Sequence, residues 1–203
     1  YLDFRGAEFV GDIRIDAGYG EDTIYGNDQD NLIVSGGGND FVDGGEGSDT
    51  YQVTGNQAGG WSSFQDYDTY ADSGLEGTDT IAAIGEDVDI GVKSFGPETG
   101  IEEIDGTGAT GRVRMLGDWQ ANVLDFRGTT FIGGNVVIDG GYGDDTLFGT
   151  GGDDTMVGAG GNDTLDGWEG SDRYEVTGNE SEGWSSFAGY DTYADTGTTG
   201  TDT

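Results

Sequence analysis

The chain has 203 residues, of which 43 are glycine and one is proline, and its 41 acidic and 7 basic residues give a formal net charge of -34. This charge disfavours nucleic acids and anionic membrane surfaces as partners, because their phosphates would be repelled, and it favours multivalent cations. Histidine and cysteine are both absent, which excludes disulfides, zinc sites of the usual kind and most histidine-based catalysis. No apolar run approaches the ~18 residues that a membrane-spanning helix requires, so membrane insertion is not expected.

Low apolar content accompanies the high charge, since only 33% of the residues are hydrophobic. That combination is typical of a chain that stays disordered. It is also compatible with a chain that folds once something neutralises its carboxylates. The regular spacing of the acids favours the second interpretation.

The first regular segment covers residues 17–52 and repeats every nine residues. Its four copies read AGYGEDTIY, GNDQDNLIV, SGGGNDFVD and GGEGSDTYQ. Glycine recurs at the first, second and fourth positions, Asp or Asn holds the sixth, and an apolar residue or tyrosine holds the eighth. Glycine permits positive φ in tight turns, and the apolar eighth position predicts a short strand with one side chain in a core.

The segment that follows keeps this rhythm more weakly. A good copy, GLEGTDTIA, spans 74–82, GDWQANVLD at 117–125 resembles GNDQDNLIV, and the Tyr-Asp-Thr-Tyr sequences at 67–70 and 190–193 retain part of the motif. Apolar clusters recur about every ten residues and predict short strands at 81–84, 88–92, 101–104, 113–116 and 123–126. No apolar pattern with a 3.6-residue period persists, so essentially no helix is expected. The segment 81–121 lacks the full motif and is expected to form metal-poor coils within an unbroken solenoid.

A second block covers residues 140–175 and reads GGYGDDTLF, GTGGDDTMV, GAGGNDTLD and GWEGSDRYE. It belongs to a longer repeat, because residues 12–80 align with 135–203 at an offset of 123, with 41 of 69 positions identical. Upstream, residues 2–6 match 124–128 at an offset of 122. We therefore divide the chain into a first unit, 1–123, with its block at 17–52, and a second unit, 124–203, with its block at 140–175. We expect both units to lie in one continuous solenoid and to be an excerpt of a longer tandem array.

Stacking of the nonapeptides brings their sixth positions together. Two nonapeptides make one coil, with a turn and a short strand on each side, so that the sixth positions of alternate repeats lie about 5 Å apart, the spacing of neighbouring strands. Stacked carboxylates repel each other unless a hard cation lies between them, and calcium accepts six to eight oxygen ligands, including backbone carbonyls. The predicted pairs are Asp22 with Asp40, Asn31 with Asp49, Asp145 with Asp163, and Asp154 with Asp172.

The pattern G-G-x-G-x-D-x-apolar-x resembles the haemolysin-type calcium-binding repeat, also called the repeats-in-toxin or RTX repeat. The resemblance covers 17–52 and 140–175, and it implies an all-β fold, a right-handed parallel β-roll. It also implies several calcium ions, at least four here, held by the sixth-position side chains and by backbone carbonyls of the turns. Carried over to this chain, the carbonyls are those near Gly18, Gly20, Gly36, Gly38, Gly141, Gly143, Ala159 and Gly161. The family has Gly and Asp where this chain has Gln29 and Asn31, so we expect a weaker site at Asn31.

Other polar and aromatic residues have plainer interpretations. We expect a solvated acidic face from the acids outside the register, namely Asp66, Glu76, Glu86, Asp87, Asp89, Glu98, Glu102 and Glu103. The tryptophans either cover a thin core or form a sugar-binding or lateral contact stripe; they are Trp61, Trp119, Trp168 and Trp184. Paired carboxylates also catalyse glycoside hydrolysis, but an active site is normally single, whereas these carboxylates recur in every turn. We therefore do not expect an enzyme.

Two functions remain open from the sequence. The first is a calcium-dependent structural segment of a long repetitive secreted protein, such as an adhesin, a fibre or a matrix component, that folds on calcium binding outside the cell. Tandem, nearly identical units favour this function, and neighbouring copies of the unit, joined end to end, would be its partners. The second is an RTX secretion and folding tail of an extracellular enzyme or toxin whose catalytic domain lies outside these residues. The resemblance implies type I secretion and an extracellular or cell-surface location.

Overall fold

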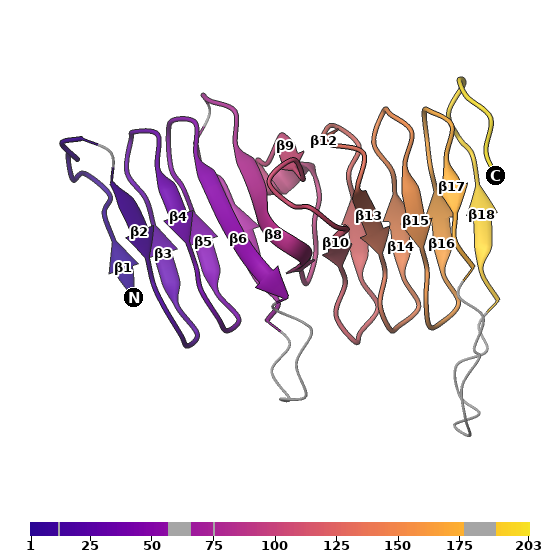
Figure 1. Ribbon diagram of the computed structural model, residues 1–203, viewed down its shortest axis with the longest axis horizontal. Coiled ribbons are helices and arrows are strands. Elements are labelled where there is room, and N and C mark those ends of the chain that lie inside the picture. The colour runs from indigo at the N-terminus through magenta and orange to yellow at the C-terminus, as the bar shows by residue number, and fades with distance from the viewer. Residues whose placement is uncertain (12, 57–65, 75, 177–189) are drawn as a thin grey trace.

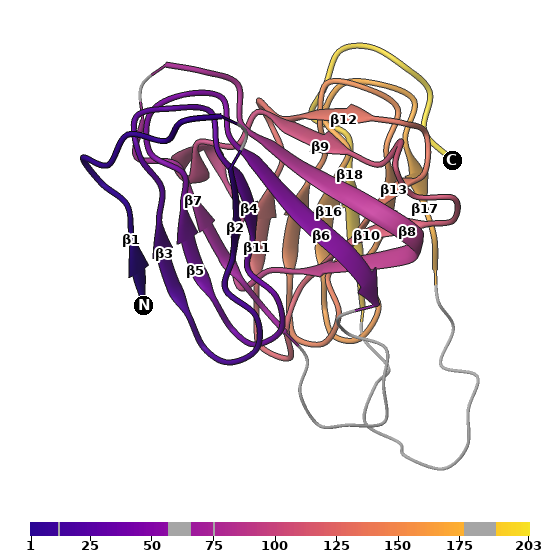
Figure 2. The same cartoon turned by 60° about the vertical axis from the view of Figure 1, so that its left-hand side comes forward.

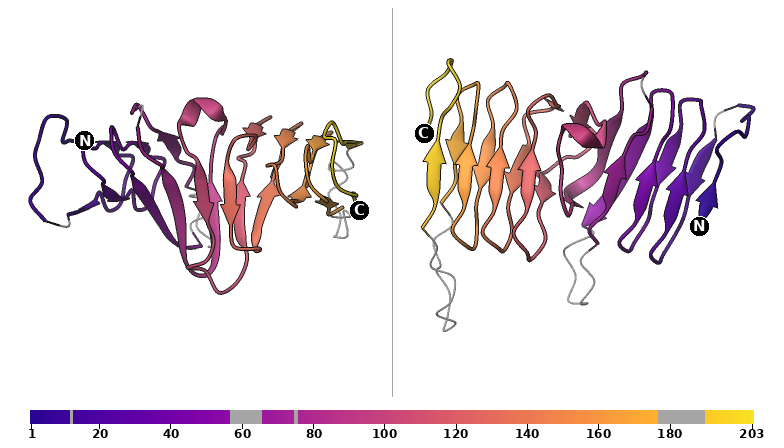
Figure 3. Two further views of the ribbon diagram at one scale, coloured as in Figure 1. Left: turned by 90° about the horizontal axis from the view of Figure 1, so that it is seen from above. Right: turned by 180° about the vertical axis from the view of Figure 1, so that it is seen from behind.

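The protein consists mainly of short parallel strands, most of them three residues long (Figure 1). The computed structural model describes residues 1–11, 13–56, 66–74, 76–176 and 190–203. Within the two repeat blocks, consecutive strands alternate between two facing layers, so that each pair of strands completes one coil. The coils follow one another along the long axis, and the two chain ends lie at opposite ends of the molecule (Figure 3). The predicted all-β, parallel solenoid is therefore confirmed.

One layer is a sheet that runs the length of the molecule. Along its main path the strands, in spatial order, are β2 (Arg14–Asp16), β4 (Leu32–Val34), β6 (Thr50–Asn56), β8 (Thr80–Gly91), β10 (Val113–Leu116), β13 (Val136–Asp139), β15 (Thr155–Val157) and β17 (Arg173–Tyr174). Two further strands, β9 (Glu103–Asp105) and β12 (Thr130–Ile132), branch from β8.

The facing layer consists of two four-stranded sheets (Figure 2). The first contains β1 (Leu2–Asp3), β3 (Thr23–Tyr25), β5 (Phe41–Asp43) and β7 (Thr69–Ala71). The second contains β11 (Val123–Asp125), β14 (Thr146–Phe148), β16 (Thr164–Asp166) and β18 (Thr192–Ala194).

Stacked coils place equivalent repeat positions beside each other. Ile24 pairs with Val42 across β3 and β5, and Leu147 pairs with Leu165 across β14 and β16, which is the predicted eighteen-residue register. Seven of the eight eighth-position side chains are at most 2% exposed, and only Tyr174 is partly exposed. Each three-residue strand thus contributes about one side chain to the core, which explains how a chain with so few apolar residues acquires one.

The motif-poor segment carries the long sheet across the middle of the molecule. The first part of β8 pairs with β6 and β9, whereas its end pairs with β10. In the facing layer this segment contributes isolated β-bridges in place of a strand ladder, and one of them joins Phe95 to Leu124. The Phe95 and Phe126 rings stack there with centroids 4.6 Å apart, and one hydrophobic cluster extends from Ile15 to Leu165. The apolar clusters of 81–126 therefore serve the same core as the repeat blocks.

Helical structure is limited to one 3-10 turn, Pro97–Thr99, within the described residues. No helix in this part of the chain is long and apolar enough to cross a membrane.

A buried ion pair in the motif-poor segment corrects one expectation. Asp89 was predicted to lie on a solvated acidic face, but it is only 4% exposed. Its two carboxylate oxygens accept hydrogen bonds from Nε and Nη2 of Arg114, both at 2.6 Å, and Arg114 Nη1 reaches Asp139 at 3.3 Å. The guanidinium thereby links β8, β10 and β13. The prediction failed because the partner of Asp89 lies 25 residues away, outside any nonapeptide register.

We predict that Arg114→Ala lowers the free energy of unfolding in saturating calcium by about 3 kcal/mol, because it leaves two buried carboxylates without a counter-charge. Arg112→Ala is the matched control, since the Arg112 side chain is 54% exposed and lies 4.0 Å from Glu175. That exposed pair should contribute less than about 0.5 kcal/mol. Urea denaturation followed by circular dichroism measures both values, and equal effects would contradict the assigned role of Arg114.

Candidate metal sites along the turns

The structure stacks all four predicted sixth-position pairs in the same way. In each pair, Oδ1 of the later residue accepts a hydrogen bond from the backbone N–H of the earlier one. The donor–acceptor distances are 2.7 Å for Asp22 to Asp40, 2.7 Å for Asn31 to Asp49, 2.9 Å for Asp145 to Asp163 and 2.9 Å for Asp154 to Asp172. One oxygen of each later carboxylate therefore joins two coils, and the other remains available for a second interaction.

That second oxygen is buried and has no hydrogen-bond partner at five of the eight predicted positions. The residues are Asp40, Asp49, Asp145, Asp163 and Asp172. All five are at most 2% exposed. Leaving a buried acceptor unsatisfied costs roughly 1–3 kcal/mol, and more where the group is charged. This cost recurs at five equivalent positions of the sequence repeat, so the chain alone leaves all five oxygens unsatisfied.

First-position glycines make room beside four of these five oxygens, those of Asp49, Asp145, Asp163 and Asp172. A Cβ at Gly140 would lie 2.6 Å from Oδ2 of Asp145 and 2.9 Å from the Gly158 carbonyl oxygen, and a Cβ at Gly44 would overlap Oδ2 of Asp49. Any side chain larger than hydrogen would therefore fill the space where a carboxylate and a main-chain carbonyl come together. These oxygen donors suit a hard cation such as calcium. The first-position carbonyls were not among the predicted ligands.

The predicted turn carbonyls come from backbone with positive φ. The φ angles of all eight turn residues, Gly18, Gly20, Gly36, Gly38, Gly141, Gly143, Ala159 and Gly161, lie between 65° and 151°. A Cβ at Gly36 would overlap the Gly18 carbonyl oxygen. The carbonyls of Gly18 and Gly141 each accept a 2.9 Å hydrogen bond from the N–H of the next turn. These carbonyls thus help to stack the turns, and each retains a second lone pair.

Two of the predicted positions are satisfied within their own turns. Oδ1 of Asn31 accepts a 3.0 Å hydrogen bond from the Asn27 N–H, while its Nδ2 donates to Oδ1 of Asn27 and to the carbonyl of Gln29. Oδ2 of Asp154 accepts from the Thr150 N–H at 2.7 Å and from the Thr150 hydroxyl. Asp22, at the first coil, is partly exposed and lies 3.6 Å from the N-terminal amine of Tyr1. At these positions, protein groups therefore supply some of the hydrogen-bonding or ion-pair partners that the five unpartnered carboxylate oxygens lack.

The stacks continue beyond the repeat blocks to residues that were not predicted as ligands. The further N–H to carboxylate bonds are Asp40 to Asp68, Asp49 to Asp79, Asp79 to Glu102, Asn122 to Asp145, Asp163 to Asp191, and Asp172 to Asp202. We call each series of stacked sixth positions and these continuations a ladder. Most of the residues that continue the ladders lie in the weaker sequence copies, at 67–70, 74–82, 117–125 and 190–193. Glu102, expected on the solvated face, is exposed but also ends one ladder.

Burial raises the pKa of five ladder carboxyls well above the usual value of 3.8. The pKa of Asp49, Asp68, Asp145 and Asp154 rises to about 7 and that of Asp163 to about 6, first because burial disfavours the charged form and second because neighbouring carboxylates repel it. Hydrogen bonds from backbone N–H groups oppose these shifts. Near neutral pH these five carboxyls thus need a proton or a cation.

A family model of the RTX calcium-binding nonapeptide repeat, which contains four copies of the repeat, matches this chain at residues 16–51, 133–156 and 139–174. These segments contain all eight predicted sixth-position residues. None of the curated proteins compared with the chain matches it.

We predict opposite pH dependences with and without calcium. A carboxyl whose pKa is raised by folding binds more protons in the folded state, so stability falls as pH rises from about 4 through about 7. In chelator, the strand signal in circular dichroism should therefore increase when pH falls from about 8 to about 5.5. With calcium, protons compete with the ion and the same change should weaken the fold. A chelated chain that gains no strand signal on acidification would contradict this account.

We also predict that Asp40→Ala weakens calcium binding at its turn by about tenfold or more, or ~1.4 kcal/mol, because one buried carboxylate and its charge are lost. Glu98→Ala, which removes an exposed acid outside the ladders, should leave calcium binding unchanged. Isothermal titration calorimetry compares the two variants, and similar losses from both would argue that only the overall charge matters.

Proposed function

We propose, from the premise that this chain carries RTX calcium-binding nonapeptide repeats, that it is a calcium-dependent structural segment of a long repetitive secreted protein. Such a protein would be an adhesin, a fibre or a matrix component. The single observation that supports calcium dependence best is the set of five buried carboxylate oxygens without partners. The RTX repeat is a structural calcium-binding element rather than a catalytic one.

The residues present suit calcium chemically. Beside Gly140, an unpartnered carboxylate oxygen of Asp145 and the carbonyl oxygen of Gly158 come together, and both are ligands of the kind that calcium prefers. Asp40, Asp49, Asp145, Asp163 and Asp172 would contribute carboxylates, and carbonyls of the first, second and fourth turn positions would complete the sites. Bound calcium supplies positive charge between stacked carboxylates, and it needs the six to eight oxygen ligands that such turns offer.

Calcium would act as a folding switch. A formal charge of -34 opposes compaction, and ions that bind only the folded state stabilise it by mass action. Extracellular calcium modules typically bind at about 10⁻⁴–10⁻³ M, so sites of this affinity fill outside the cell. The chain would cross an export channel unfolded, by type I secretion, and fold on arrival.

Equivalent contacts in the two proposed units, 1–123 and 124–203, support a tandem architecture. Tyr51 Oη donates to the Ala71 carbonyl at 2.9 Å, and Tyr174 Oη donates to the Ala194 carbonyl at 2.8 Å, at an offset of 123. The same hydroxyls accept from the N–H of Gly44 and Gly167, both at 2.9 Å. We infer that successive units continue the long sheet and join end to end, as an extended fibre requires.

The alternative function is a secretion and folding tail of an extracellular enzyme or toxin. The calcium ladder would operate identically in that setting, because it depends only on stacked turns. The full-length sequence separates the two functions: many further units without a catalytic domain support the fibre, whereas an adjoining enzyme domain supports the tail. The regular 123-residue offset favours the fibre.

We predict that the chain is largely unfolded in chelator at neutral pH and gains its strand signal on addition of calcium, with a midpoint at about 10⁻⁴–10⁻³ M. Magnesium, which demands a smaller octahedral site and keeps several waters, should not replace calcium at equal concentration. Far-ultraviolet circular dichroism provides the measurement. A full strand signal in chelator, or a midpoint near 10⁻⁷ M, would refute the export switch.

A further inference from the structure

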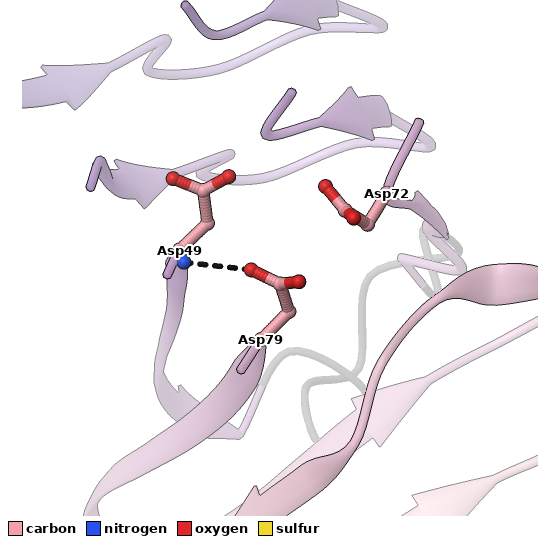
Figure 4. Close-up of side chains that lie close together, drawn as sticks. All are labelled: Asp49, Asp72 and Asp79. Atoms are coloured by element: carbon pink, nitrogen blue, oxygen red, sulfur yellow. Dashed lines mark hydrogen bonds between the residues drawn. The ribbon is translucent and has the colours of Figure 1, made fainter. Parts of the chain in front are cut away.

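Three carboxylates converge where the first repeat block ends. Asp49 precedes β6, Asp72 follows β7 and Asp79 precedes β8, and one oxygen from each lies within 4.8 Å of the other two. Figure 4 shows the Asp72 carboxylate facing those of Asp49 and Asp79. Asp49 and Asp79 are consecutive members of one ladder, whereas Asp72 has no place in the nonapeptide register.

Local hydrogen bonds fix this arrangement. Asp79 Oδ1 accepts the Asp49 N–H at 2.7 Å, which stacks the two turns. On the other side, Tyr51 Oη holds the Ala71 carbonyl at 2.9 Å and Asp43 Oδ1 accepts the Ser73 N–H at 3.0 Å. The residues on both sides of Asp72 are thus tied to the preceding coil, so its carboxylate is placed beside those of Asp49 and Asp79.

The cluster contains two buried oxygens that nothing satisfies. Oδ2 of Asp49 has no hydrogen-bond partner although that residue is only 1% exposed, and Oδ1 of Asp72 is also buried without a partner. Among the described residues, no arginine or lysine forms an ion pair with any of the three acids. Three carboxylates at this separation repel one another strongly, and a divalent cation reverses that energy.

We propose that Asp49, Asp72 and Asp79 form a three-carboxylate calcium site that differs in composition from the paired sites of the ladder. The proposal rests on the proposed function, namely that the stacked turns bind calcium, and it adds a ligand from outside the repeat. A third carboxylate raises the negative charge around the ion, which strengthens calcium binding. This site should therefore bind more tightly than the sites made by two stacked carboxylates.

The second unit repeats the same three acids. Asp172, Asp195 and Asp202 have the sequence spacing of Asp49, Asp72 and Asp79, and each follows its counterpart by 123 residues. Oδ2 of Asp172 is buried without a partner, and Asp202 Oδ1 accepts the Asp172 N–H at 3.1 Å. Asp195 is exposed. The sequence thus provides one such triad in each unit.

The position of the triad gives it a structural role. The stretch between Asp49 and Asp79 contains β6 and β7, and Asp79 leads directly into β8, which carries the long sheet into the motif-poor segment. An ion held by all three acids would tie the end of β7 to the start of β8. Calcium at this point would therefore extend calcium-dependent folding from the repeat block into β8.

Asp72→Asn in the full chain tests the proposal, because it removes one charge with little change in shape. Glu76→Gln is the matched control, since Glu76 is exposed and lies in the same connection. Isothermal titration calorimetry should show that Asp72→Asn loses one of the tightest calcium sites or weakens it by at least tenfold, while Glu76→Gln matches the wild type. Hydrogen exchange at sub-saturating calcium should show faster exchange at the start of β8 in Asp72→Asn alone.

The outcomes separate this proposal from the proposed function. If the wild type binds no calcium, the ladder and the triad fail together. If the wild type binds calcium and Asp72→Asn binds the same number of ions with the same affinities, the triad is wrong and the ladder stands. Should Asp72→Asn fail to fold, Asp72→Glu, which keeps a carboxylate, should fold in calcium; failure of both variants in saturating calcium would make Asp72 a packing residue and overturn the proposal.

Discussion

The fold depends on one repeated interaction, in which an aspartate of one coil accepts the backbone N–H of the sixth residue in the coil before it. At Asp40 and Asp163 this bond uses Oδ1 and leaves Oδ2 buried without a partner. The interaction aligns the turns, and it also gathers negative charge along the stack. The same side chain thus aligns the turns and destabilises the stack through its buried charge. The fold therefore needs a counter-ion wherever the second oxygen is unpartnered.

The thin core explains why this electrostatic problem is not outweighed by packing. A three-residue strand buries about one side chain, such as Ile24 or Leu165, between the two layers. Burial of one such side chain contributes roughly 1.5–3 kcal/mol, whereas ordering the nine residues of its repeat costs about 1–2 kcal/mol per residue in backbone entropy alone. Backbone hydrogen bonds and bound ions must offset the remainder. The large number of glycines increases that entropy cost, and their positions in the turns show why they are nevertheless required.

The sequence predicted the repeating part of the structure because a fixed spacing determines it. An eighteen-residue offset was enough to pair Asp145 with Asp163 and to place Leu147 in the core. Asp68 stacks on Asp40 and Asp79 on Asp49 through connections of 28 to 30 residues. The nonapeptide spacing does not predict pairings at these separations. Asp72 and the Asp89–Arg114 pair were missed for the same reason, since each depends on how a longer excursion returns to the stack. Trp61 and Trp184 lie outside the described residues, while Trp119 is exposed and Trp168 adopts a φ of 67° at a turn.

The exceptions along the ladders follow the same physical rule. Asn31 and Asn122 each begin a ladder within the described part of the chain, and both carry an amide where later coils carry a carboxylate. The Asn31 amide donates to Asn27 and Gln29, and the Asn122 amide donates to Asp118 at 3.0 Å and to the Lys93 carbonyl at 3.1 Å. An amide brings its own N–H donors and no charge, so the turns at Asn31 and Asn122 are held partly by protein groups. A carboxylate brings only acceptors, so a later turn requires an external cation where no protein donor reaches its second oxygen, as at Asp40 and Asp163. The hydrogen-bond donors that the protein itself supplies at each turn therefore determine which turns depend on calcium most strongly.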